Sequence, residues 1–428
     1  MNIRKIIQPL SYFIRGDFRY YYYSKLLKNL KLSREEVINL QNNKLRKLIC
    51  HAYDSVPFYR EYFKKKGLQP DDIKNISDLV HLPIMTKQII KNNINKLKNI
   101  RYKRLIRVTS GGSTGEAAVI YKSPYFLQMS RAVSMRNFSI AGWLPWSKSV
   151  WIWAAPYEHQ HISKSLIARL GMFINGRLFL DVFSYSPSDF SLWAEKIKLF
   201  KPEILYGYAH IILEFAVWCI TNNVRFESIE KVVTTAETLT DKKTIERAFG
   251  VKVYDQYGSR EVLSIAIECK NGSMHISDDT VVIEQTDENH LLITALDSFH
   301  FPIIRYEIGD TGVKLNRTCP CGLNFSLMDL KIGRISDNFI LPNGRKICGF
   351  ATKVSKLINM NKYQLIQKEI DSFELKFVGN MDEGIQMKFR QALEKYFGKV
   401  EIVFTPVENI PVEPSGKRFL FKCLVRNP

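Results

Sequence analysis

Short apolar runs alternate with longer amphipathic stretches between residues 105 and 255. Runs of the first kind predict strands, and stretches with a period near 3.6 predict helices. The expected strands lie at 105–109, 149–153, 204–206, 231–235 and 251–255, and the expected helices at 124–141, 189–199, 211–220 and 241–249. Strands and helices in alternation imply right-handed crossovers and a largely parallel sheet with helices on both faces.

The pattern changes twice further along the chain. Apolar runs at 281–284 and 290–295 flank a polar turn, which predicts antiparallel strands. After 333–338 the chain predicts a compact α+β module, with strands at 372–378 and 399–404 and a helix at 383–396. We therefore expect an α/β fold in two domains. A large N-terminal layered α/β domain with partly parallel sheets would cover residues 1–333, and a small α+β C-terminal domain would cover residues 334–428.

The composition is that of a globular protein, with 428 residues of which 46% are apolar and 24% charged. The longest apolar run, 211–220, is interrupted by Glu214 and is shorter than the roughly 18 residues of a membrane span. Polar residues stand where a signal peptide needs its apolar core. Seven cysteines in a chain this long do not make a disulfide framework. We expect a soluble, cytoplasmic protein.

The net charge of +20 raises the question of nucleic acid. Much of the excess is lysine dispersed among Ile and Asn, as at 87–98, which is typical of a solvated surface, so we expect no specific nucleic-acid partner. A second alternative concerns residues 1–31, where basic residues mix with Phe13, Phe18 and the tyrosines at 20–23. That mixture suits anionic headgroups and weak membrane-surface association. A helix packed on its own domain is the simpler interpretation.

A loop rich in glycine and hydroxyl groups follows the first expected strand. It comprises Ser110, Gly111, Gly112, Ser113, Thr114 and Gly115. Its glycines allow the backbone to approach an anion closely, and its hydroxyl and N–H groups can donate to phosphate oxygens. It matches neither the Walker A pattern nor the G-x-G-x-x-G pattern. Taken alone, such a stretch is more often a surface turn.

Four further segments carry candidate chemistry. In the segment 254–261, Tyr257 offers an aromatic face, Asp255 can accept from an adenine amine, and Glu261 suits Mg²⁺. The segment 302–310 ends in Asp310, a carboxylate that can accept from ribose hydroxyls. The other two are 333–337, which contains Arg334, and 414–417, which ends in Lys417. Turns recruit such residues anyway, but the order and spacing of all five segments together are not those of ordinary turns.

Together the five segments resemble the acyl-adenylate-forming superfamily, and specifically its short branch of phenylacetate-CoA ligases and CapK-type proteins of capsular polysaccharide clusters. Other stretches resemble the same branch, and the resemblance extends over about residues 40–420. These stretches are Val56-Pro57-Phe58-Tyr59-Arg60, Leu82-Pro83, Lys201-Pro202, Tyr206-Gly207-Tyr208 and Thr235-Ala236-Glu237. The resemblance implies ATP and Mg²⁺ as cofactors and a C-terminal domain that acts as a mobile lid.

The resemblance also implies a role for each candidate. The loop 110–115 would bind the β- and γ-phosphates, with Thr114 as a catalytic residue. Ala236, Glu237 and Asp255 would frame adenine, and Tyr257, followed by Gly258, would stack on it. Asp310 would bind the ribose, and Arg334 the ribose or a phosphate. Glu261 would bind Mg²⁺, and Lys417 would bridge the carboxylate and the α-phosphate. Two positions depart from the family pattern. Arg260 stands where Thr often precedes the glutamate, and Ser336 followed by Asp337 leaves the hinge residue undefined.

Cys269, His275, Cys319 and Cys321 form a separate constellation. Three thiolates and one imidazole make a closed tetrahedral zinc shell, with Gly272 and Gly322 allowing tight turns. The spacing differs from the strong C-x2-C pattern, and isolated thiols are the alternative. Some members of the branch carry a structural metal in this region, so the resemblance adds Zn²⁺ as an expected ligand.

Aromatic residues gather at the strand ends where the superfamily places its acyl pocket. The expected pocket residues are Trp153, Ala154, Tyr157, Tyr206, Tyr208 and His210. We therefore expect an AMP-forming ligase that adenylates a carboxylic acid and transfers the acyl group to CoA or another thiol. Transfer to an amine or hydroxyl in surface polysaccharide synthesis is one alternative, and a non-catalytic nucleic-acid-binding protein is another. Both a monomer and a homodimer remain open.

Overall fold

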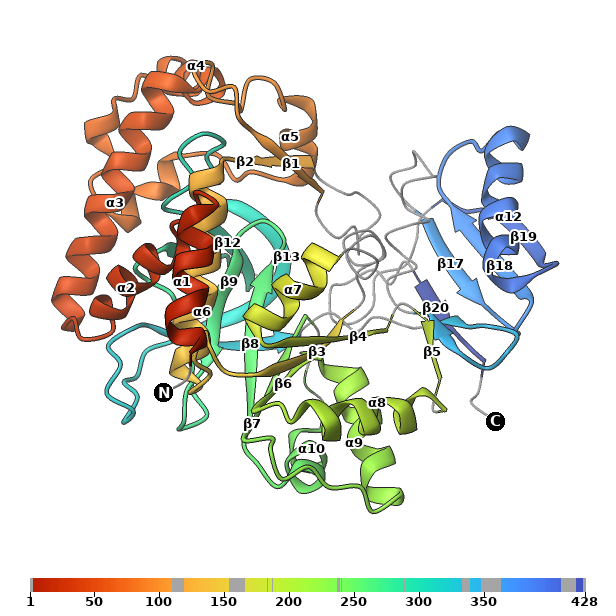
Figure 1. The fold of residues 1–428 in the computed structure, drawn as a ribbon. Coiled ribbons are helices and arrows are strands. Elements are labelled where there is room, and N and C mark those ends of the chain that lie inside the picture. Colours follow the sequence, from red (N-terminus) through yellow and green to blue (C-terminus); the bar gives the residue numbers. More distant parts are fainter. Residues whose placement is uncertain are drawn as a thin grey trace.

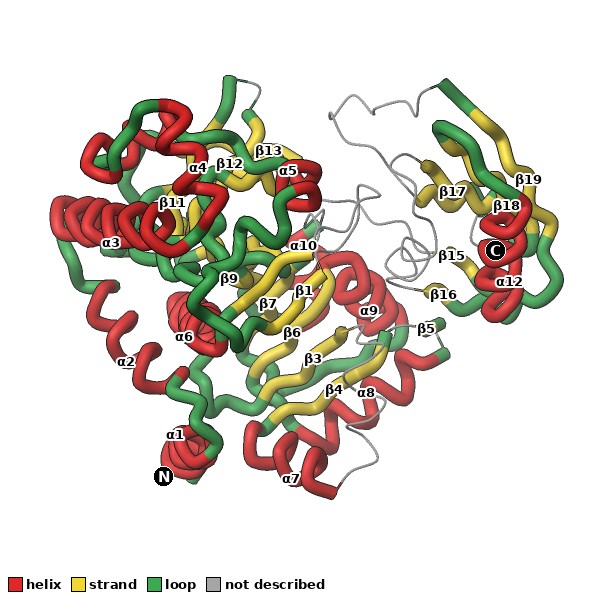
Figure 2. Tube along the Cα trace, turned by 90° about the horizontal axis from the view of Figure 1, so that it is seen from above, coloured by secondary structure: helices red, strands yellow, loops and turns green. Residues whose placement is uncertain are grey.

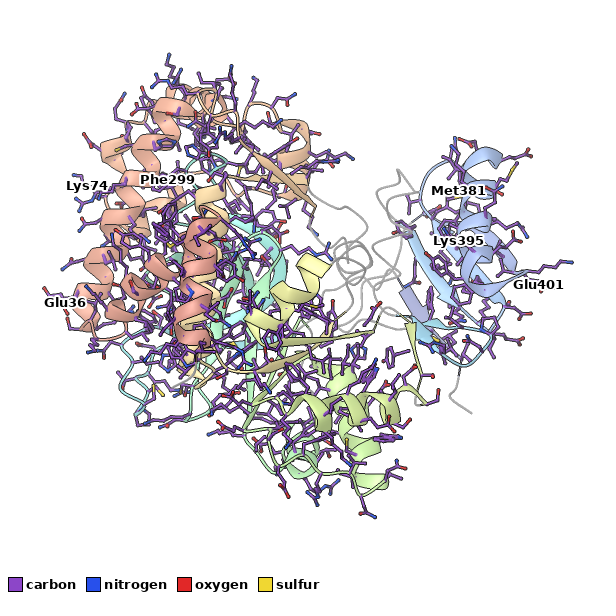
Figure 3. The ribbon with its side chains drawn as sticks, in the orientation of Figure 1. Glu36, Lys74, Phe299, Met381, Lys395 and Glu401 are labelled. Carbon is purple, nitrogen blue, oxygen red and sulfur yellow. The ribbon has the colours of Figure 1, made fainter. Side chains whose placement is uncertain are left out.

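The computed structural model describes residues 3–109, 119–153, 166–182, 184–186, 188–236, 239, 241–287, 289–332, 339–347, 363–408 and 421–425. Within this part, one large sheet with flanking helices forms the N-terminal unit, and a smaller sheet with one helix forms the C-terminal unit (Figure 1). Glu36 and Lys74 lie on the side of the molecule opposite the C-terminal unit, which carries Lys395 and Glu401 (Figure 3). The expected α/β class is confirmed.

An 11-stranded sheet is the centre of the N-terminal unit. Its strands, in spatial order, are β11 (Val281–Gln285), β12 (His290–Ala295), β13 (Tyr306–Leu315), β14 (Leu327–Ile332), β10 (Met274–Ile276), β9 (Leu263–Glu268), β8 (Val253–Ser259), β7 (Lys231–Thr235), β6 (Ile204–Tyr208), β3 (Ser149–Trp153) and β4 (Arg177–Asp181). The strands from β8 to β4 are parallel, and those from β8 to β11 are antiparallel. The partly parallel sheet and the antiparallel pair after residue 281 are therefore confirmed.

The parallel strands lie between layers of helices. Helices α8 (Asp189–Phe200), α9 (Ala209–Thr221) and α10 (Lys242–Phe249) cover one face, and α7 (Leu166–Asn175) lies on the other (Figure 1). Phe190, Phe215 and Phe249 are buried in the core beneath the first three helices. Only glycine fits at 207, because a Cβ there would lie 2.5 Å from the carbonyl oxygen of Ile152 on the neighbouring strand.

The first five helices precede the large sheet in the sequence; the third to fifth share a hydrophobic core with its antiparallel strands, whereas the first packs on α7. The five helices are α1 (Arg4–Ile14), α2 (Arg19–Asn29), α3 (Arg34–Ser55), α4 (Pro57–Lys66) and α5 (Lys87–Asn92), with 3-10 turns at Pro70–Asp72 and Ile76–His81. The ends of α3 and α4 follow from local chemistry. Ser33 and Glu36 form a capping box that starts α3, and Gly67 ends α4 in the left-handed conformation (φ +65°).

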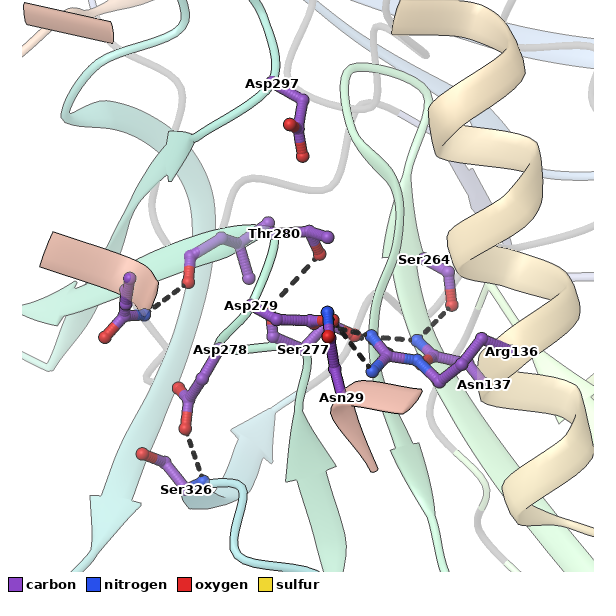
Figure 4. A network of polar contacts seen from close by, with 12 residues as sticks. Asn29, Arg136, Asn137, Ser264, Ser277, Asp278, Asp279, Thr280, Asp297 and Ser326 are labelled. Atoms are coloured by element: carbon purple, nitrogen blue, oxygen red, sulfur yellow. Dashed lines mark hydrogen bonds and ion pairs between the residues drawn. The ribbon is translucent and has the colours of Figure 1, made fainter. Parts of the chain in front are cut away.

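A buried polar network fixes α6 (Pro124–Ile140) to the middle of the sheet (Figure 4). Arg136 and Asp279 are both fully buried and form an ion pair of 2.8 Å. Asn29 of α2 donates to the same carboxylate at 2.8 Å, and Asn137 donates to the hydroxyls of Ser264 and Ser277, also at 2.8 Å. Removing one partner of a buried pair costs about 3–5 kcal/mol, so the network specifies where α2 and α6 lie.

One sequence expectation about the sheet is wrong. The strand expected at 105–109 exists as β1 (Ile106–Thr109), but it does not join the parallel sheet. It pairs antiparallel with β2 (Val119–Lys122) in a separate two-stranded sheet. The reason is a second strand before the helix. Residues 119–122 alternate between half-buried and buried positions and return along β1, so helix α6 begins only after this hairpin.

The C-terminal unit has its own core. Strands β17 (Tyr363–Gln367), β18 (Ser372–Phe377), β19 (Glu401–Pro406) and β20 (Phe421–Cys423) form a four-stranded sheet that packs on helix α12 (Glu383–Phe397). Phe373, Leu375 and Phe389 are buried between them. The helix expected at 383–396 and the strand expected at 372–378 are confirmed, and the last expected strand begins two residues later, at Glu401.

A short hairpin joins the two units. Strands β15 (Phe339–Ile340) and β16 (Lys346–Ile347) pair with each other, and β16 also pairs with β5 (Ser184–Tyr185) of the N-terminal unit. The buried side chain of Gln367 exchanges hydrogen bonds with the backbone of Ile340, which ties the hairpin to β17. Arg345 in the hairpin forms an ion pair of 3.2 Å with Asp189 at the start of α8. The hairpin therefore belongs to the C-terminal core and docks on the N-terminal unit.

Candidate active site

Three predicted site residues, Tyr257, Glu261 and Asp310, lie on or beside β8 and β13. The hydroxyl of Tyr257 donates to Oδ2 of Asp310 at 3.0 Å, and both side chains are buried. The hydroxyl of Tyr306 donates to Oε1 of Glu261 at 3.1 Å. Strands β8 and β13 are separated by β9, β10 and β14 in the sheet, so these contacts require the antiparallel half to curl back on itself. The curl brings Tyr257 into contact with Asp310, and Glu261 into contact with Tyr306.

Asp255 is held by hydrogen bonds within the parallel sheet. Its Oδ1 accepts from the hydroxyl of Thr234 at 2.9 Å and from the backbone N–H of Gln256 at 3.1 Å. Desolvation raises the pKa of the Asp255 carboxyl to about 6, while the Thr234 hydroxyl acts in the opposite direction and the negative charge of Glu268 adds to the rise. A carboxylate with its pKa near neutrality is typical of a functional site, although structural networks also produce one.

Backbone geometry sets apart two further predicted residues. Ala236, at the end of β7, has φ +72°, a conformation that costs a non-glycine residue energy and that is concentrated at binding sites. Gly258 lies at a β-bulge in the antiparallel pairing of β8 with β9, and a Cβ there would lie 1.9 Å from the carbonyl oxygen of Leu263. Gly258 is therefore required for the close approach of these strands, whatever it contributes to nucleotide binding.

The structure adds a residue that the sequence reasoning missed. Lys122 is the last residue of β2, and the glycine-rich segment 110–115 precedes this strand in the sequence. The side chain of Lys122 is only 1% exposed. Burial lowers the pKa of its ammonium to about 8, and the nearby carboxylate of Glu261 opposes that shift. The sequence carries no signal for this burial, because Val119, Ile120 and Tyr121 before it are all apolar, and the alternation of half-buried and buried positions is a property of the folded strand. A lone lysine in a lysine-rich chain did not stand out.

The Glu261 side chain fits a Mg²⁺ ligand. It is 4% exposed, accepts from the hydroxyl of Tyr306 and lies close enough to the buried Lys122 to interact with its charge. Mg²⁺ in nucleotide sites is usually held by one or two carboxylates together with phosphate oxygens. A single buried carboxylate at this place matches that requirement. Lys122 would compensate its charge when no metal is bound.

Three predicted acyl-pocket residues form one aromatic cluster. Trp153 stacks on Tyr206 with ring centroids 5.7 Å apart and on Tyr208 at 4.6 Å. His210 lies next to Tyr208, with 6.4 Å between the centroids. The buried Tyr206 hydroxyl donates to Gln256 of β8 at 3.2 Å, so this ring is part of the core, whereas Trp153 and Tyr208 are half-buried at the carboxyl ends of β3 and β6.

The cysteine and histidine constellation converges on one point. The ligand atoms of Cys269, His275, Cys319 and Cys321 all lie within 4.8 Å of one another. The two sulfurs of Cys269 and Cys319 are 3.6 Å apart, and Cys321 Sγ is 3.2 Å from Nε2 of His275. In tetrahedral zinc sites with Zn–S bonds of about 2.3 Å, neighbouring sulfurs lie about 3.8 Å apart, and a disulfide would need about 2.05 Å.

The surroundings of this cluster also fit a metal. The N–H of Asn271 points to Cys269 Sγ at 3.4 Å, a contact typical of metal-bound thiolates. Gly272 and Gly322 both have positive φ, at +75° and +91°, as the expected tight turns require. The cluster would fasten the β9–β10 hairpin to the segment between β13 and β14.

Several predicted residues lie outside the described part of the chain. They are Ser110, Gly111, Gly112, Ser113, Thr114, Gly115, Ala154, Tyr157, Glu237, Arg334 and Lys417. Their roles stay predictions. The described residues bring together Asp255, Tyr257, Glu261 and Asp310 in one region and Trp153, Tyr206, Tyr208 and His210 in another, and Tyr206 and Gln256 connect the two.

The amino-acid sequence was compared with those of known proteins. No family model matches the chain. The chain is 28% identical over 430 residues to Protein CapK of Staphylococcus aureus, which covers 95% of this chain and 93% of that protein. It is 27% identical over 332 residues to phenylacetate-coenzyme A ligase of Escherichia coli (strain K12), covering 72% of this chain and 74% of that protein.

The fold has a close counterpart among solved structures. A structure of 2-hydroxyisobutyryl-CoA ligase in complex with 2-HIB-AMP and CoA matches with a TM-score of 0.62 and 16% identity, covering 93% of this chain and 92% of that chain. Similarity in sequence and in fold extends along nearly the whole chain. The chain is therefore similar in sequence to Protein CapK and to phenylacetate-CoA ligases, and it shares the fold of the 2-hydroxyisobutyryl-CoA ligase.

Proposed function

We propose that the protein activates a carboxylic acid with ATP and transfers the acyl group to CoA. In the first step a carboxylate oxygen attacks the α-phosphorus of ATP, the bond to the bridging oxygen breaks, and pyrophosphate leaves. In the second step the CoA thiolate attacks the acyl carbonyl carbon and AMP leaves. The observation that carries the proposal is the pair of contacts Tyr257–Asp310 and Glu261–Tyr306, which join the end of β8 to β13 in a chain similar to phenylacetate-CoA ligases.

The residues would divide the work by charge. Asp255 and Ala236 would border adenine, Tyr257 would present its ring to it, and Asp310 would accept from ribose hydroxyls. Glu261 would hold Mg²⁺, which would neutralise the phosphates, and Lys417 would stabilise the charge that develops at the α-phosphate. Such preorganised groups are the main source of rate enhancement in phosphoryl chemistry.

We also propose that residues 334–428 act as a mobile lid. In the described part of the chain, the C-terminal core includes residues from Phe339 onward and meets the N-terminal unit through the short β5–β16 pairing and the Arg345–Asp189 ion pair. Contacts of this kind allow one unit to move against the other. The lid would bring Lys417 to the site for adenylation and remove it for acyl transfer.

A structural zinc ion at Cys269, His275, Cys319 and Cys321 completes the proposal. The four ligand atoms and their turns match a closed tetrahedral site, which has no open position for catalysis. The ion would hold the curled, antiparallel half of the sheet, which carries Asp310.

Acid-dependent ATP–pyrophosphate exchange across a panel of carboxylic acids tests the function. We expect exchange with at least one acid, hydroxylamine-trappable product, and CoA-dependent release of AMP. Lys417→Ala should slow adenylate formation by about 10²–10³-fold and affect transfer from a supplied acyl-adenylate much less. Glu261→Gln should impair adenylation through weaker Mg²⁺ binding. Equal adenylation by Lys417→Ala and wild type would contradict the assignment of the lysine.

One observation favours a second candidate function. Similarity to Protein CapK extends over 95% of the chain, against 72% for the Escherichia coli ligase. The same adenylate would then pass to an amine or hydroxyl acceptor in surface polysaccharide synthesis. Pyrophosphate exchange without CoA-dependent AMP release, followed by release on addition of an amino sugar, would favour this alternative.

A further inference from the structure

Helix α1 turns its polar side to the protein. Gln8 is 1% exposed and donates from Nε2 to the carbonyl oxygen of Ile174 at 3.1 Å, at the end of α7. Tyr12 donates to Oδ1 of Asn175 at 2.9 Å, and Tyr20 of α2 donates to Gln8 Oε1 at 2.6 Å. The helix does pack on its own domain, as the simpler interpretation held, but its polar side makes these contacts.

The apolar side of α1 consequently faces solvent. Its exposed residues are Ile3 (65%), Ile6 (54%), Ile7 (37%), Leu10 (56%), Phe13 (63%) and Ile14 (75%). Their spacing of three and four residues puts them on one face of the helix. Single exposed apolar residues are ordinary, but a continuous stripe marks an interaction surface. Helix α1 lies in front of the N-terminal unit in Figure 1 and at the edge of the molecule in Figure 2, and the exposed fractions of its apolar residues show that the stripe is accessible.

The segment that carries the stripe is strongly basic. Five exposed basic residues lie in α1 or α2 or within two residues of the end of one of these helices: Lys5, Arg15, Lys25, Lys28 and Lys31. The single acid among residues 3–31 is Asp17, which forms ion pairs with Arg19 and Arg131. Residues 3–31 thus expose several bases, and their one carboxylate is paired.

We propose that α1 and α2 dock on an anionic lipid bilayer. The stripe would lie in the interface with the aliphatic residues among the acyl chains, Phe13, Phe18 and Tyr21 at the headgroup level, and the bases on lipid phosphates. A shallow, mostly apolar groove between the helices, lined by Pro9, Leu10 and Tyr21, extends this surface.

Two other occupants fit less well. Helix α1 has 11 residues and is about 16 Å long, so it lies along a bilayer rather than across it, and no helix in the described part of the chain is long and apolar enough to cross one. A second copy of this chain would bring five exposed bases against five identical ones. Charge complementarity therefore selects a negatively charged surface.

Docking would orient the rest of the molecule. Helix α1 rests on α7, which leads into β4. On β4, Arg177 lies over the ring of Trp151 at 4.6 Å, and Trp151 contacts Tyr206 of the aromatic cluster at 4.7 Å. The β3–β4 edge of the sheet would thus face the membrane. This inference does not depend on the proposed function.

Co-sedimentation of the full chain with vesicles tests the proposal. We expect binding to phosphatidylcholine vesicles that contain about a third phosphatidylglycerol, weaker binding to pure phosphatidylcholine, and weakening by salt. Leu10→Asp with Phe13→Asp should reduce binding at least tenfold, because both residues are exposed and their loss removes apolar contact without disturbing the core. Lys25→Gln, Lys28→Gln and Lys31→Gln together should reduce binding to anionic vesicles by roughly a hundredfold and leave binding to neutral vesicles unchanged.

The control is Leu199→Asp, at a leucine on α8 that is even more exposed (87%) than Leu10 and Phe13. It should bind vesicles like the wild type, and circular dichroism should show all variants folded. Wild-type protein that stays in solution with anionic vesicles would overturn the proposal. So would equal binding by the α1 variant and the control. A lipid-free dimer that the α1 substitutions convert to a monomer would assign the surface to a second copy instead.

Discussion

At the scale of single residues, Lys122 combines a stability cost with a functional position. Burial lowers its pKa to about 8 from the usual 10.5, so the unfolded chain binds more protons than the folded one between those values. The free energy of unfolding should therefore rise with pH across this window. In Lys122→Met that rise should disappear, and stability at pH 7 should increase by up to about 3 kcal/mol. Urea unfolding at pH 7 and pH 10 measures both.

The same variant should lose adenylation by at least tenfold, because Lys122 lies beside Glu261 and contributes positive charge where phosphates would bind. Lys103→Met, an exposed lysine near β1, is the control and should change neither quantity. A stabilised Lys122→Met enzyme with normal pyrophosphate exchange would show that the lysine has no part in catalysis.

Asp255 should make ATP binding sensitive to pH. Its pKa is raised to about 6 from 3.8, so the folded protein holds the extra proton between these values, and this group's contribution to stability falls as pH rises through the window. If the ionised carboxylate accepts from the adenine amine, the KM for ATP should rise about tenfold as pH falls below 6. Asp255→Asn should flatten the profile.

The matched substrate control is an ATP analogue that lacks the 6-amino group. Its KM should already be independent of pH in the wild type between pH 5 and pH 7, a window set by the pKa of about 6. An analogue profile that follows that of ATP would move the titrating group away from adenine.

The sequence indicated which residues could bind a nucleotide but not how their side chains pack. Tyr257 and Asp310 are predicted nucleotide ligands, and their mutual hydrogen bond depends on the curl of the sheet, which no local pattern encodes. Lys122 was missed for the same reason, since its burial follows from the packing of β2. The roles themselves came from the family resemblance, because isolated turns with Gly, Asp and Ser carry little information.

At the scale of elements, the cysteine and histidine cluster should behave as a clip. Protein purified without chelator should contain close to one zinc per chain, since metal binding to such a site is coupled to folding. EDTA should lower the Tm, and Cys321→Ser should abolish the metal and the EDTA effect together. The control is Cys50→Ser, an exposed cysteine on α3 outside the cluster. Absence of zinc from untreated wild-type protein would contradict the proposal.

Elements with strong periodicity were predicted to within a few residues, and those with interrupted patterns were not. Strands β3, β7 and β12 have the expected bounds, because their residues are continuously apolar or alternate cleanly. Strand β13 was missed, since Gly309, Asp310 and Gly312 within it are typical of turns. Helix α1 has a clear helical period, but periodicity alone does not say which side faces the protein.

At the scale of the whole molecule, the order of the sheet was only partly predictable. The parallel half follows from strand–helix alternation, whereas the continuation through β9, β10 and β14 depends on pairings between segments far apart in the sequence. The same limit applies to the contact between the units. Nothing in residues 184–185 or 346–347 indicates that two such short strands pair.

The docked hairpin should influence the balance between the two half-reactions. The Arg345–Asp189 ion pair and the β5–β16 pairing hold the C-terminal unit in one arrangement, whereas the proposed cycle needs two. Arg345→Ala removes an ion pair that is partly exposed and contributes about 0–1 kcal/mol, so it should shift the balance by up to about fivefold. Because stabilising one arrangement disfavours the other, adenylation and acyl transfer should change in opposite directions. Pyrophosphate exchange and thioester formation from a supplied acyl-adenylate measure the two rates separately.

The control is Lys395→Ala, on the exposed side of α12, which should leave both rates unchanged. If Arg345→Ala altered both rates in the same direction, the hairpin would be a structural support of the lid and not a determinant of its position.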